Sequence, residues 1–189
     1  MVTLQDTDIV SALQEDGERG FRLLMTKYKQ VVYWHIRRLV VSHDDAQDAV
    51  QETFIRVFRS FDQFKGKNSL EQFQEKCSLA AWIYRIATNE ALRILQRRHS
   101  DQLSLENVLT EANRQKAENY VDYNDLEAVK LQKAILSLPT KQQLAFNLRY
   151  YDELGYDEIA NITGSKPANV KANYHIAKEK IVKYMKTND

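Results

Sequence analysis

A short break separates two helical patterns near the end of the chain and limits how this part can fold. Residues 156–163 predict one helix, and the apolar positions from Val170 to Tyr184 recur at steps of four and three, as on one face of a second helix. Gly164 suits the residue after a helix, which commonly takes a positive φ, and Pro167 suits the first turn of the next helix. The turn of about three residues between them predicts a helix-turn-helix.

The second helix of this pair has an uneven distribution of charge. Six Lys and one Glu over residues 164–186 give it a net charge of +5. The inward stripe is Val170, Tyr174, Ala177, Ile181 and Tyr184, and the opposite side carries Asn169, Lys171, Asn173, Lys178, Lys180 and Lys183. A local excess of cations on one helix is typical of nucleic-acid binding. The alternative is a three-helix bundle whose lysines form an ordinary solvated face.

Two patterns complete the expected C-terminal bundle. A helix is expected to begin at Thr140, with Gln143 completing a capping box. Its inward residues would be Leu144, Leu148 and Tyr151, and those of the helix over 156–163 would be Tyr156, Ile159, Ala160 and Ile162. These three helices form the expected DNA-binding unit.

The whole composition favours an all-α protein with local rather than global affinity for DNA. The chain has 189 residues, five Gly and two Pro, and its 27 basic and 26 acidic residues give a net charge of +1. The single Cys77 excludes an intrachain disulfide and indicates a reducing, cytoplasmic location. The N-terminus is not expected to be a signal peptide, and no apolar run approaches the about 20 residues that span a bilayer.

An acidic segment separates the expected domains. Over residues 101–127 there are seven acidic and two basic residues, a net charge of −5, and the apolar periodicity is weak. This composition predicts a flexible acidic linker between two small helical domains, at 1–100 and 128–189.

The first domain is expected to contain helices at about 8–14 and 17–41, and a third from Ser42 or Asp44. The third would bury Ala46, Val50, Phe54, Val57 and Phe61, and expose Asp45, Asp48, Gln51, Glu52 and Arg56. Gly66 is expected to break any helix after Phe61. Several hydrogen-bond donors follow, from Lys65, Lys67, Asn68 and Ser69.

A helix over 79–98 closes this domain and shows two stripes. Leu79, Ile83, Ile86, Ala87 and Ile94 would be buried, whereas Arg85, Asn89, Arg93 and Gln96 share another face that Arg97 and Arg98 extend. Residues 76–98 carry a net charge of +4, and Trp82 and Tyr84 lie among the cations. Cations with aromatic residues suit single-stranded bases, which need charge for phosphates and faces for stacking. The alternative is that the aromatics belong to the core and the arginines interact with the helix dipole.

Five motifs together resemble the extracytoplasmic-function (ECF) sigma factors of bacterial RNA polymerase. They are DAQDAVQETF at 45–54, AWIYRIATN at 81–89, LPTKQQ at 138–143, YDEIA at 156–160 and VKANYHIA at 170–177. The resemblance implies an initiation factor whose first domain docks on the polymerase and melts the minus-ten element. Its last domain would read the minus-thirty-five element as duplex. The implied partners are the beta and beta-prime subunits of the polymerase core, promoter DNA and an anti-sigma factor, with no membrane insertion.

The resemblance assigns expected roles to three groups of residues. Asp48, Gln51, Glu52 and Phe54 would bind core polymerase. Lys65, Lys67, Asn68, Ser69, Trp82, Arg85, Asn89, Arg93 and Arg97 would hold the minus-ten single strand. Lys166, Asn169, Lys171, Asn173, His175 and Lys178 would form the duplex recognition helix. The sequence departs from the family in an apparent insertion at 70–78, and in Lys166 and Asn169, where Ser or Thr and Thr are usual.

Two other classes of function make different predictions. A stand-alone helix-turn-helix regulator would bind duplex operators without polymerase, usually as a dimer on paired half-sites. An enzyme is not expected, because the chain has no Gly-rich phosphate loop and no HExxH motif. His35, His43, His99 and His175 lack the spacing of metal ligands, so neither a metal nor a cofactor is expected.

Overall fold

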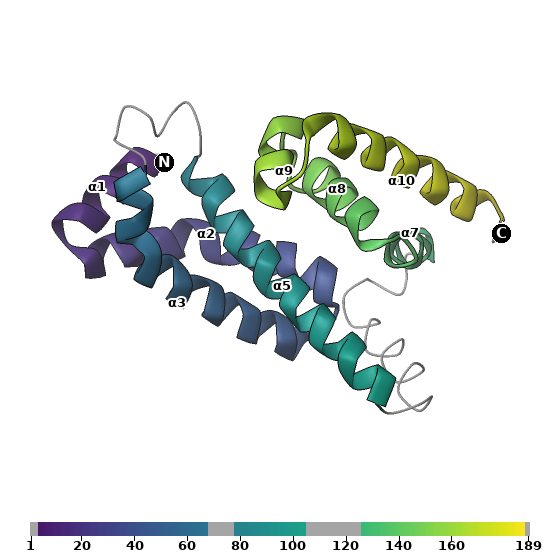
Figure 1. Cartoon of the computed structure of the whole chain (residues 1–189), viewed down its shortest axis with the longest axis horizontal. Coiled ribbons are helices and arrows are strands. Elements are labelled where there is room, and N and C mark those ends of the chain that lie inside the picture. Colours follow the sequence, from purple (N-terminus) through teal and green to yellow (C-terminus); the bar gives the residue numbers. More distant parts are fainter. Residues whose placement is uncertain (1–3, 68–77, 105–125, 188–189) are drawn as a thin grey trace.

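A computed structural model describes residues 4–67, 78–104 and 126–187, with side chains over 4–62, 78–98 and 126–187. All regular structure in these ranges is helical, as the composition predicts. The N-terminal half consists of α1 (Asp6–Glu15), α2 (Gly17–Val40), α3 (His43–Lys67) and α5 (Leu79–Ser104), and the C-terminal half of α7 (Leu126–Leu136), α8 (Thr140–Tyr150), α9 (Tyr156–Thr163) and α10 (Pro167–Thr187). Figure 1 shows α5 lying between the rest of its own half and the helices α8 and α9.

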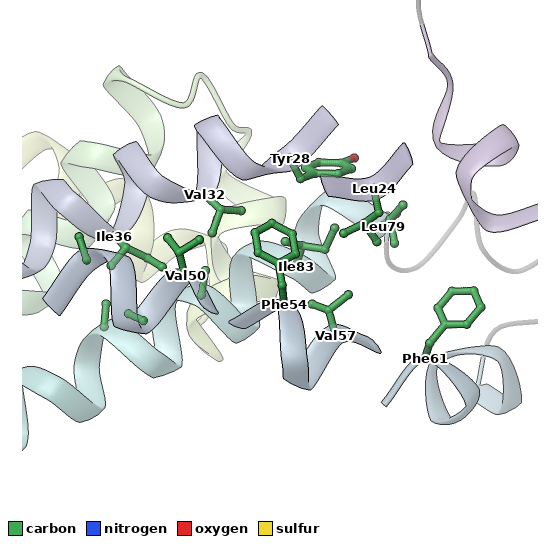
Figure 2. Packing of buried hydrophobic residues seen from close by; sticks show 14 of the residues in the cluster. Leu24, Tyr28, Val32, Ile36, Val50, Phe54, Val57, Phe61, Leu79 and Ile83 are labelled. Carbon is green, nitrogen blue, oxygen red and sulfur yellow. The ribbon is translucent and has the colours of Figure 1, made fainter. Parts of the chain in front are cut away.

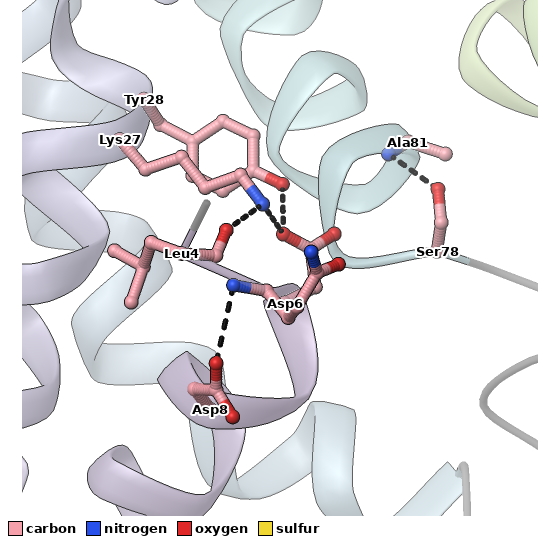
Figure 3. Close-up of polar contacts among 8 residues, drawn as sticks. Leu4, Asp6, Asp8, Lys27, Tyr28, Ser78 and Ala81 are labelled. Carbon is pink, nitrogen blue, oxygen red and sulfur yellow. Dashed lines mark hydrogen bonds and ion pairs between the residues drawn. The ribbon is translucent and has the colours of Figure 1, made fainter. Parts of the chain in front are cut away.

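Short polar side chains fix where several helices begin. The Asp16 carboxylate accepts hydrogen bonds from the backbone N–H groups of Glu18 and Arg19, at 3.0 and 3.2 Å, and so caps α2. The Ser78 hydroxyl accepts from the N–H of Ala81 at 3.1 Å and opens α5, as Figure 3 shows. Local hydrogen bonds therefore fix where these two helices begin.

The core of the N-terminal half confirms the predicted stripe of the third helix. All five of its inward residues are buried, and Figure 2 shows that Phe54 and Val57 of α3 point toward α2 and α5. The residues that surround them are Leu24, Tyr28, Val32, Ile36, Leu79 and Ile83. Burying a side chain of this size contributes about 1.5–3 kcal/mol, so this cluster is the main source of stability in the half.

A polar contact attaches α1 to α2 beside this core. Asp6 Oδ1 accepts hydrogen bonds from Lys27 Nζ and from the Tyr28 hydroxyl, both at 2.6 Å (Figure 3). Lys27 Nζ also donates to the carbonyl of Leu4 at 2.8 Å. Burial, and then the hydrogen bond to Asp6, raise the pKa of the Tyr28 phenol, which therefore remains a donor across the physiological pH range.

The C-terminal half contains the predicted helix-turn-helix. Gly164 ends α9 in the left-handed region, with φ 64°, and Pro167 is the first residue of α10. The N–H of Ser165 donates to the carbonyl of Ala160 at 3.0 Å across the turn. Val170, Ala177 and Ile181 of α10 are buried, which confirms the stripe that predicted the helix.

Three local predictions were wrong. Thr140 is the first residue of α8 rather than its cap, because Pro139 takes the cap position, and no side chain caps this helix. Tyr151 was expected inside but is 37% exposed, because its ring lies outside the buried clusters of the C-terminal half, against Phe146 and under the guanidinium of Arg38. Gly66 does not break α3, which ends one residue later at Lys67; a glycine in a final turn costs a helix little.

One helix is longer than the sequence predicts, and one was not predicted. Helix α5 continues beyond residue 98 to Ser104, and α7 precedes the segment in which helices were expected. The described residues do not include 70–77 of the predicted insertion, where Cys77 lies, or 105–125 of the predicted linker. Among the helices that are described, none has the length and hydropathy needed to cross a membrane.

Gly20 provides a test of how closely α1 packs on α2. A Cβ at this position would lie 2.3 Å from the backbone nitrogen of Leu13 and 2.4 Å from its Cα, so α1 would have to move. We expect Gly20→Ala to lower the free energy of unfolding by about 1–3 kcal/mol, measured by urea denaturation. At Gly17 the nearest atom to such a Cβ is 3.8 Å away, so Gly17→Ala is the matched control and should not destabilise. Equal stability of the two variants would contradict this packing.

Candidate nucleic-acid interface

Most of the predicted duplex-binding residues are exposed on α10 or next to it. They are Lys166, just before the helix, and Asn169, Lys171, His175 and Lys178 within it. The opposite face is anchored by Phe146 of α8, whose ring stacks on Tyr174 with centroids 6.0 Å apart. The buried face therefore fixes the rotation of α10 and determines which side chains can reach a groove of DNA.

Asn173 differs from its neighbours on α10. It is half-buried and lines a cavity of about 520 Å³ between α10, α8, α9 and α5. Leu92, Leu95 and Gln96 of α5 line the same cavity, and so do Gly164 and Ser165 of the turn. The N-terminal end of α10 thus faces the other half of the chain on one side and solvent on the other.

The predicted cationic stripe of α5 is present. Arg85, Asn89, Arg93 and Arg97 are all exposed, and Trp82 lies at the start of the same stripe, partly buried against the core. Tyr84, in contrast, is buried on another side of the helix, with 7% of its surface exposed. One aromatic residue, not two, therefore accompanies the cations on this face.

A buried carboxylate organises the arginines beside this stripe. Glu90 has 4% of its side chain exposed, and its two oxygens pair with Arg56 Nε of α3 at 2.8 Å and with Arg93 Nη2 at 2.6 Å. Arg56 also pairs with Glu52 at 3.0 Å. Because both arginines are held by the same carboxylate, the position of Arg93 is coupled to the packing of α3 on α5.

The sequence predicts that Arg98 extends the cationic stripe, and this prediction was wrong. Its guanidinium donates to the carbonyl of Val40 at 2.8 Å and pairs with Asp45, so it joins α5 to the junction of α2 and α3. Burial lowers its pKa from the usual value. Its cost of desolvation is offset by these two partners, and its role is structural.

The predicted polymerase-binding face of α3 contains two residues that the sequence analysis missed. Asp48 and Gln51 are exposed, whereas Phe54 is 3% exposed and belongs to the core, so it cannot contact a partner. Ile55 and Phe58, at 42% and 50% exposed, lie on the same side of the helix as Asp48 and Gln51. Exposed large apolar residues beside polar ones are typical of protein interfaces.

The histidines do not form a metal site in the described part of the chain. His35 is fully buried and contacts Thr88 Oγ1 at 2.9 Å, and His43 Nδ1 lies 2.8 Å from the hydroxyl of Tyr33. No group of three His, Cys, Asp or Glu side chains within residues 4–62, 78–98 and 126–187 could hold a metal ion. The structure does not describe Asn68 and Ser69. It also does not describe the side chains of Lys65, Lys67 and His99.

Comparisons with known proteins identify similar sequences over both halves. Residues 24–100 match the family described as Sigma-70 region 2, and residues 128–181 match Sigma-70, region 4. The chain is 31% identical over 190 residues to the ECF RNA polymerase sigma-E factor of Escherichia coli (strain K12), with 94% of this chain and 93% of that protein covered. The protein of the same name from Haemophilus influenzae is 29% identical over 192 residues, with 94% of each covered.

Solved structures show that the fold is shared as well. The sigma factor RpoE, solved in complex with the anti-sigma factor NepR from Bartonella quintana, has a TM-score of 0.68 and 21% identity, with 89% of this chain and 98% of that chain covered. CnrH, solved in complex with the cytosolic domain of CnrY, has a TM-score of 0.69 and 16% identity, with 97% of this chain and 99% of that chain covered. At these identities the likeness concerns the fold.

Glu90 provides a test of the electrostatics of this surface. We expect Glu90→Gln to lower the free energy of unfolding by about 1–3 kcal/mol, because it removes the buried charge that two arginines share. Glu52→Gln removes a carboxylate that pairs with the same Arg56 but has 38% of its side chain exposed, so its effect should stay within about 1 kcal/mol. Urea denaturation of both variants checks the order, and equal losses would show that Glu90 is no more than a surface partner.

Proposed function

The chain belongs to the ECF sigma factors of the sigma-70 family and is a promoter-specific transcription initiation factor, and from this premise we propose which surface performs each step. Core polymerase binds the exposed side of α3, the displaced strand of the minus-ten element binds the stripe on α5, and the minus-thirty-five duplex binds α10. The observation that carries the proposal is the separation of these surfaces on three helices, each with its opposite face buried. A stand-alone regulator needs only the last of them.

The docking surface comprises Asp48, Gln51, Ile55 and Phe58, with Glu52 at its edge. Its chemistry supports a protein partner, since two exposed apolar side chains lie among polar ones. The core subunits that we propose for it and for the rest of the chain are beta-prime and beta. Phe54 supports this surface from within the core.

The strand-capture surface comprises Trp82, Arg85, Asn89, Arg93 and Arg97. Guanidinium groups neutralise phosphates, and an indole or guanidinium plane stacks on an unpaired base, worth about 1–3 kcal/mol per base. Trp82 is partly buried, and this fixed position supports a role as a stacking platform. Lys65, Lys67, Asn68 and Ser69 are proposed to extend this surface.

The duplex surface comprises Lys166, Asn169, Lys171, His175 and Lys178, with Asn173 at its inner edge. A recognition helix reads base edges with a few side chains near its N-terminus, and each good contact discriminates by about 1–3 kcal/mol. Asn169 and Asn173 are proposed to read bases, and the lysines are proposed to contact phosphates. The net charge of +5 over residues 164–186 supports this division.

The wider arrangement follows from the same premise. We propose sigma domain two at 1–100, an acidic linker at 101–127 and sigma domain four at 128–189. The protein would act in the cytoplasm, where the polymerase is. Because both structural neighbours were solved with an anti-sigma factor or a second protein, we also propose an anti-sigma partner for this chain.

Charge reversal on α3 tests the docking surface. Asp48→Arg and Phe58→Ala should each weaken binding of the polymerase core by about tenfold or more, measured by titration of labelled protein with core. Asp48 is exposed, so the fold should not change. Glu127→Arg makes the same change of charge at an exposed position of α7, in the other half of the chain, and should bind core normally. If Asp48→Arg and Glu127→Arg bind equally well, the docking surface lies elsewhere.

Substitutions on α5 and α10 test the division between strand capture and duplex reading. With polymerase core on an identified promoter, Trp82→Ala and Arg93→Ala should reduce permanganate reactivity of unpaired thymines while leaving closed-complex binding nearly normal. A template with a pre-melted bubble should restore both variants. Asn169→Ala should do the opposite, relaxing preference at the minus-thirty-five element without impairing strand opening.

Two outcomes would contradict this division. In one, Trp82→Ala and Arg93→Ala open the promoter as well as the wild type does. In the other, their duplex binding is lost and the pre-melted bubble fails to rescue them. In either case α5 is not a strand-capturing helix.

A further inference from the structure

A buried carboxylate connects the two halves of the chain. Asp152 lies between α8 and α9, and 6% of its side chain is exposed. Its oxygens contact Arg38 Nη2 at 2.5 Å, His35 Nδ1 at 3.3 Å and the Tyr84 hydroxyl at 3.4 Å. All three partners belong to α2 and α5 of the N-terminal half, so the carboxylate of Asp152 reaches across the boundary, whereas its backbone N–H donates to the carbonyl of Asn147 in its own half.

Further contacts surround Asp152 and exclude water. The guanidinium of Arg38 also lies over the ring of Tyr151, 4.7 Å from its centroid, and the carbonyl of Arg38 accepts a hydrogen bond from Gln143 Nε2 at 3.5 Å. Beside them, Tyr84 packs in one cluster with Leu148 and Ile159. Burial, and then the charge of Asp152, raise the pKa of the Tyr84 phenol, so its hydroxyl donates to the carboxylate.

The turn that carries Asp152 is held in an uncommon conformation. Glu153 has φ 55°, a left-handed value that costs a residue with a side chain about 1–2 kcal/mol. The N–H of Leu154 donates to the carbonyl of Leu148 at 3.0 Å, and Arg149 Nη1 donates to the carbonyl of Leu154 at the same distance. The turn therefore presents Asp152 at one position instead of leaving it in solvent.

This closed arrangement conflicts with the proposed function, on which the present inference rests. The names minus-ten and minus-thirty-five place the two promoter elements about 25 base pairs apart, or about 85 Å at 3.4 Å per base pair. Helix α5 has 26 residues and α10 has 21, which correspond to lengths of about 39 and 32 Å. Because α9 packs directly on α5, the strand-capture and duplex surfaces cannot reach both elements until the halves separate.

We propose that Asp152 is an autoinhibitory latch that holds the free protein closed, and that binding to core polymerase opens it. The latch consists of Asp152 with its partners Arg38, His35 and Tyr84. A buried ion pair suits this role, because its net stabilisation is small when the separated groups regain water, yet removal of one partner leaves the other buried and unpaired. The contact is therefore specific for the closed state without making that state irreversible.

The distance between the halves measures the latch without DNA or transcription. In a Cys77→Ser background, Ser11 of α1 and Lys186 of α10, both exposed, are replaced by cysteine and labelled with a donor and an acceptor dye. Fluorescence resonance energy transfer then reports the distance between the halves. The wild type should be closed alone and should open when core polymerase is added. Asp152→Asn should shift the free protein toward the open state and raise its apparent affinity for core by about tenfold, since closure no longer competes with binding.

Control variants separate the latch from general damage. Glu153→Gln makes the same change of charge at the adjacent, exposed position and should remain closed. Tyr84→Phe removes one hydroxyl and serves as a second variant if Asp152→Asn unfolds; it should open the protein in part, with helical circular dichroism unchanged. Tyr84→Phe combined with Asp152→Asn should open it no further than Asp152→Asn alone, because the hydroxyl and the carboxylate take part in the same contact.

Two results would overturn the latch. One is a wild-type protein that is already open when free, and the other is an Asp152→Asn protein whose distance and affinity for core match those of Glu153→Gln. Transcription reports separately on the proposed function. If the wild type opens with core but gives no promoter-specific transcript, the function is wrong and the latch remains. If transcripts appear while Asp152→Asn stays closed, the latch is wrong and the function remains.

Discussion

Helix α5 is buried on two sides, and both halves of the chain pack against it. One side carries Leu79, Ile83 and Ala87 into the core of the N-terminal half, and another carries Ala81 and Tyr84 into the cluster that includes Ile159 and Val170. Only one side is left for solvent, and the cationic stripe occupies it. The same helix thus builds one core, contributes to a second and presents the proposed strand-capture surface, so motion between the halves must affect that surface.

Ion pairs restrict where a nearly neutral protein can attract DNA. Glu90, Asp45 and Asp152 hold arginines in structural contacts within or between the halves. The exposed cations that the proposed DNA surfaces can use lie on α10 and on the stripe of α5, where Arg93 also pairs with Glu90. Since the phosphate contribution to affinity scales with the number of cations engaged, a net charge of +1 favours weak binding to duplex alone and stronger binding with polymerase. A stand-alone regulator would need a larger basic surface on one domain.

Periodic features were predictable from the sequence, and isolated polar ones were not. The stripes of α3 and α10, the left-handed Gly164 and Pro167 at the start of α10 all follow from spacing and local backbone chemistry. The missed helix α7 has apolar residues at Leu131, Ala134 and Ile135, a spacing that could have revealed it. The helical period of α3 predicts Phe54 in the core, whereas the resemblance of its motif to the family assigned it to the polymerase-binding surface. The helical period was correct.

The contacts of Asp152 had no signal in the sequence. This residue lies in a short connection, and its partners are 68 to 117 positions away along the chain, so neither period nor spacing links them. The same holds for Glu90, whose pairing with Arg56 depends on how α3 packs on α5. Exposed apolar residues such as Ile55 and Phe58 were missed for another reason. Sequence periodicity distinguishes a helix's buried stripe from its exposed face, but it does not show which apolar residues beside the stripe remain uncovered.

Run-off transcription tests most directly whether three surfaces of this chain act together with polymerase. Purified protein and polymerase core are mixed on genomic fragments, with core alone and protein alone as controls. We expect discrete transcripts from a small set of promoters only when both are present, and weak, unspecific duplex binding by the protein alone. Tight, sequence-specific binding to duplex by the free protein, with no transcript when core is added, would contradict it.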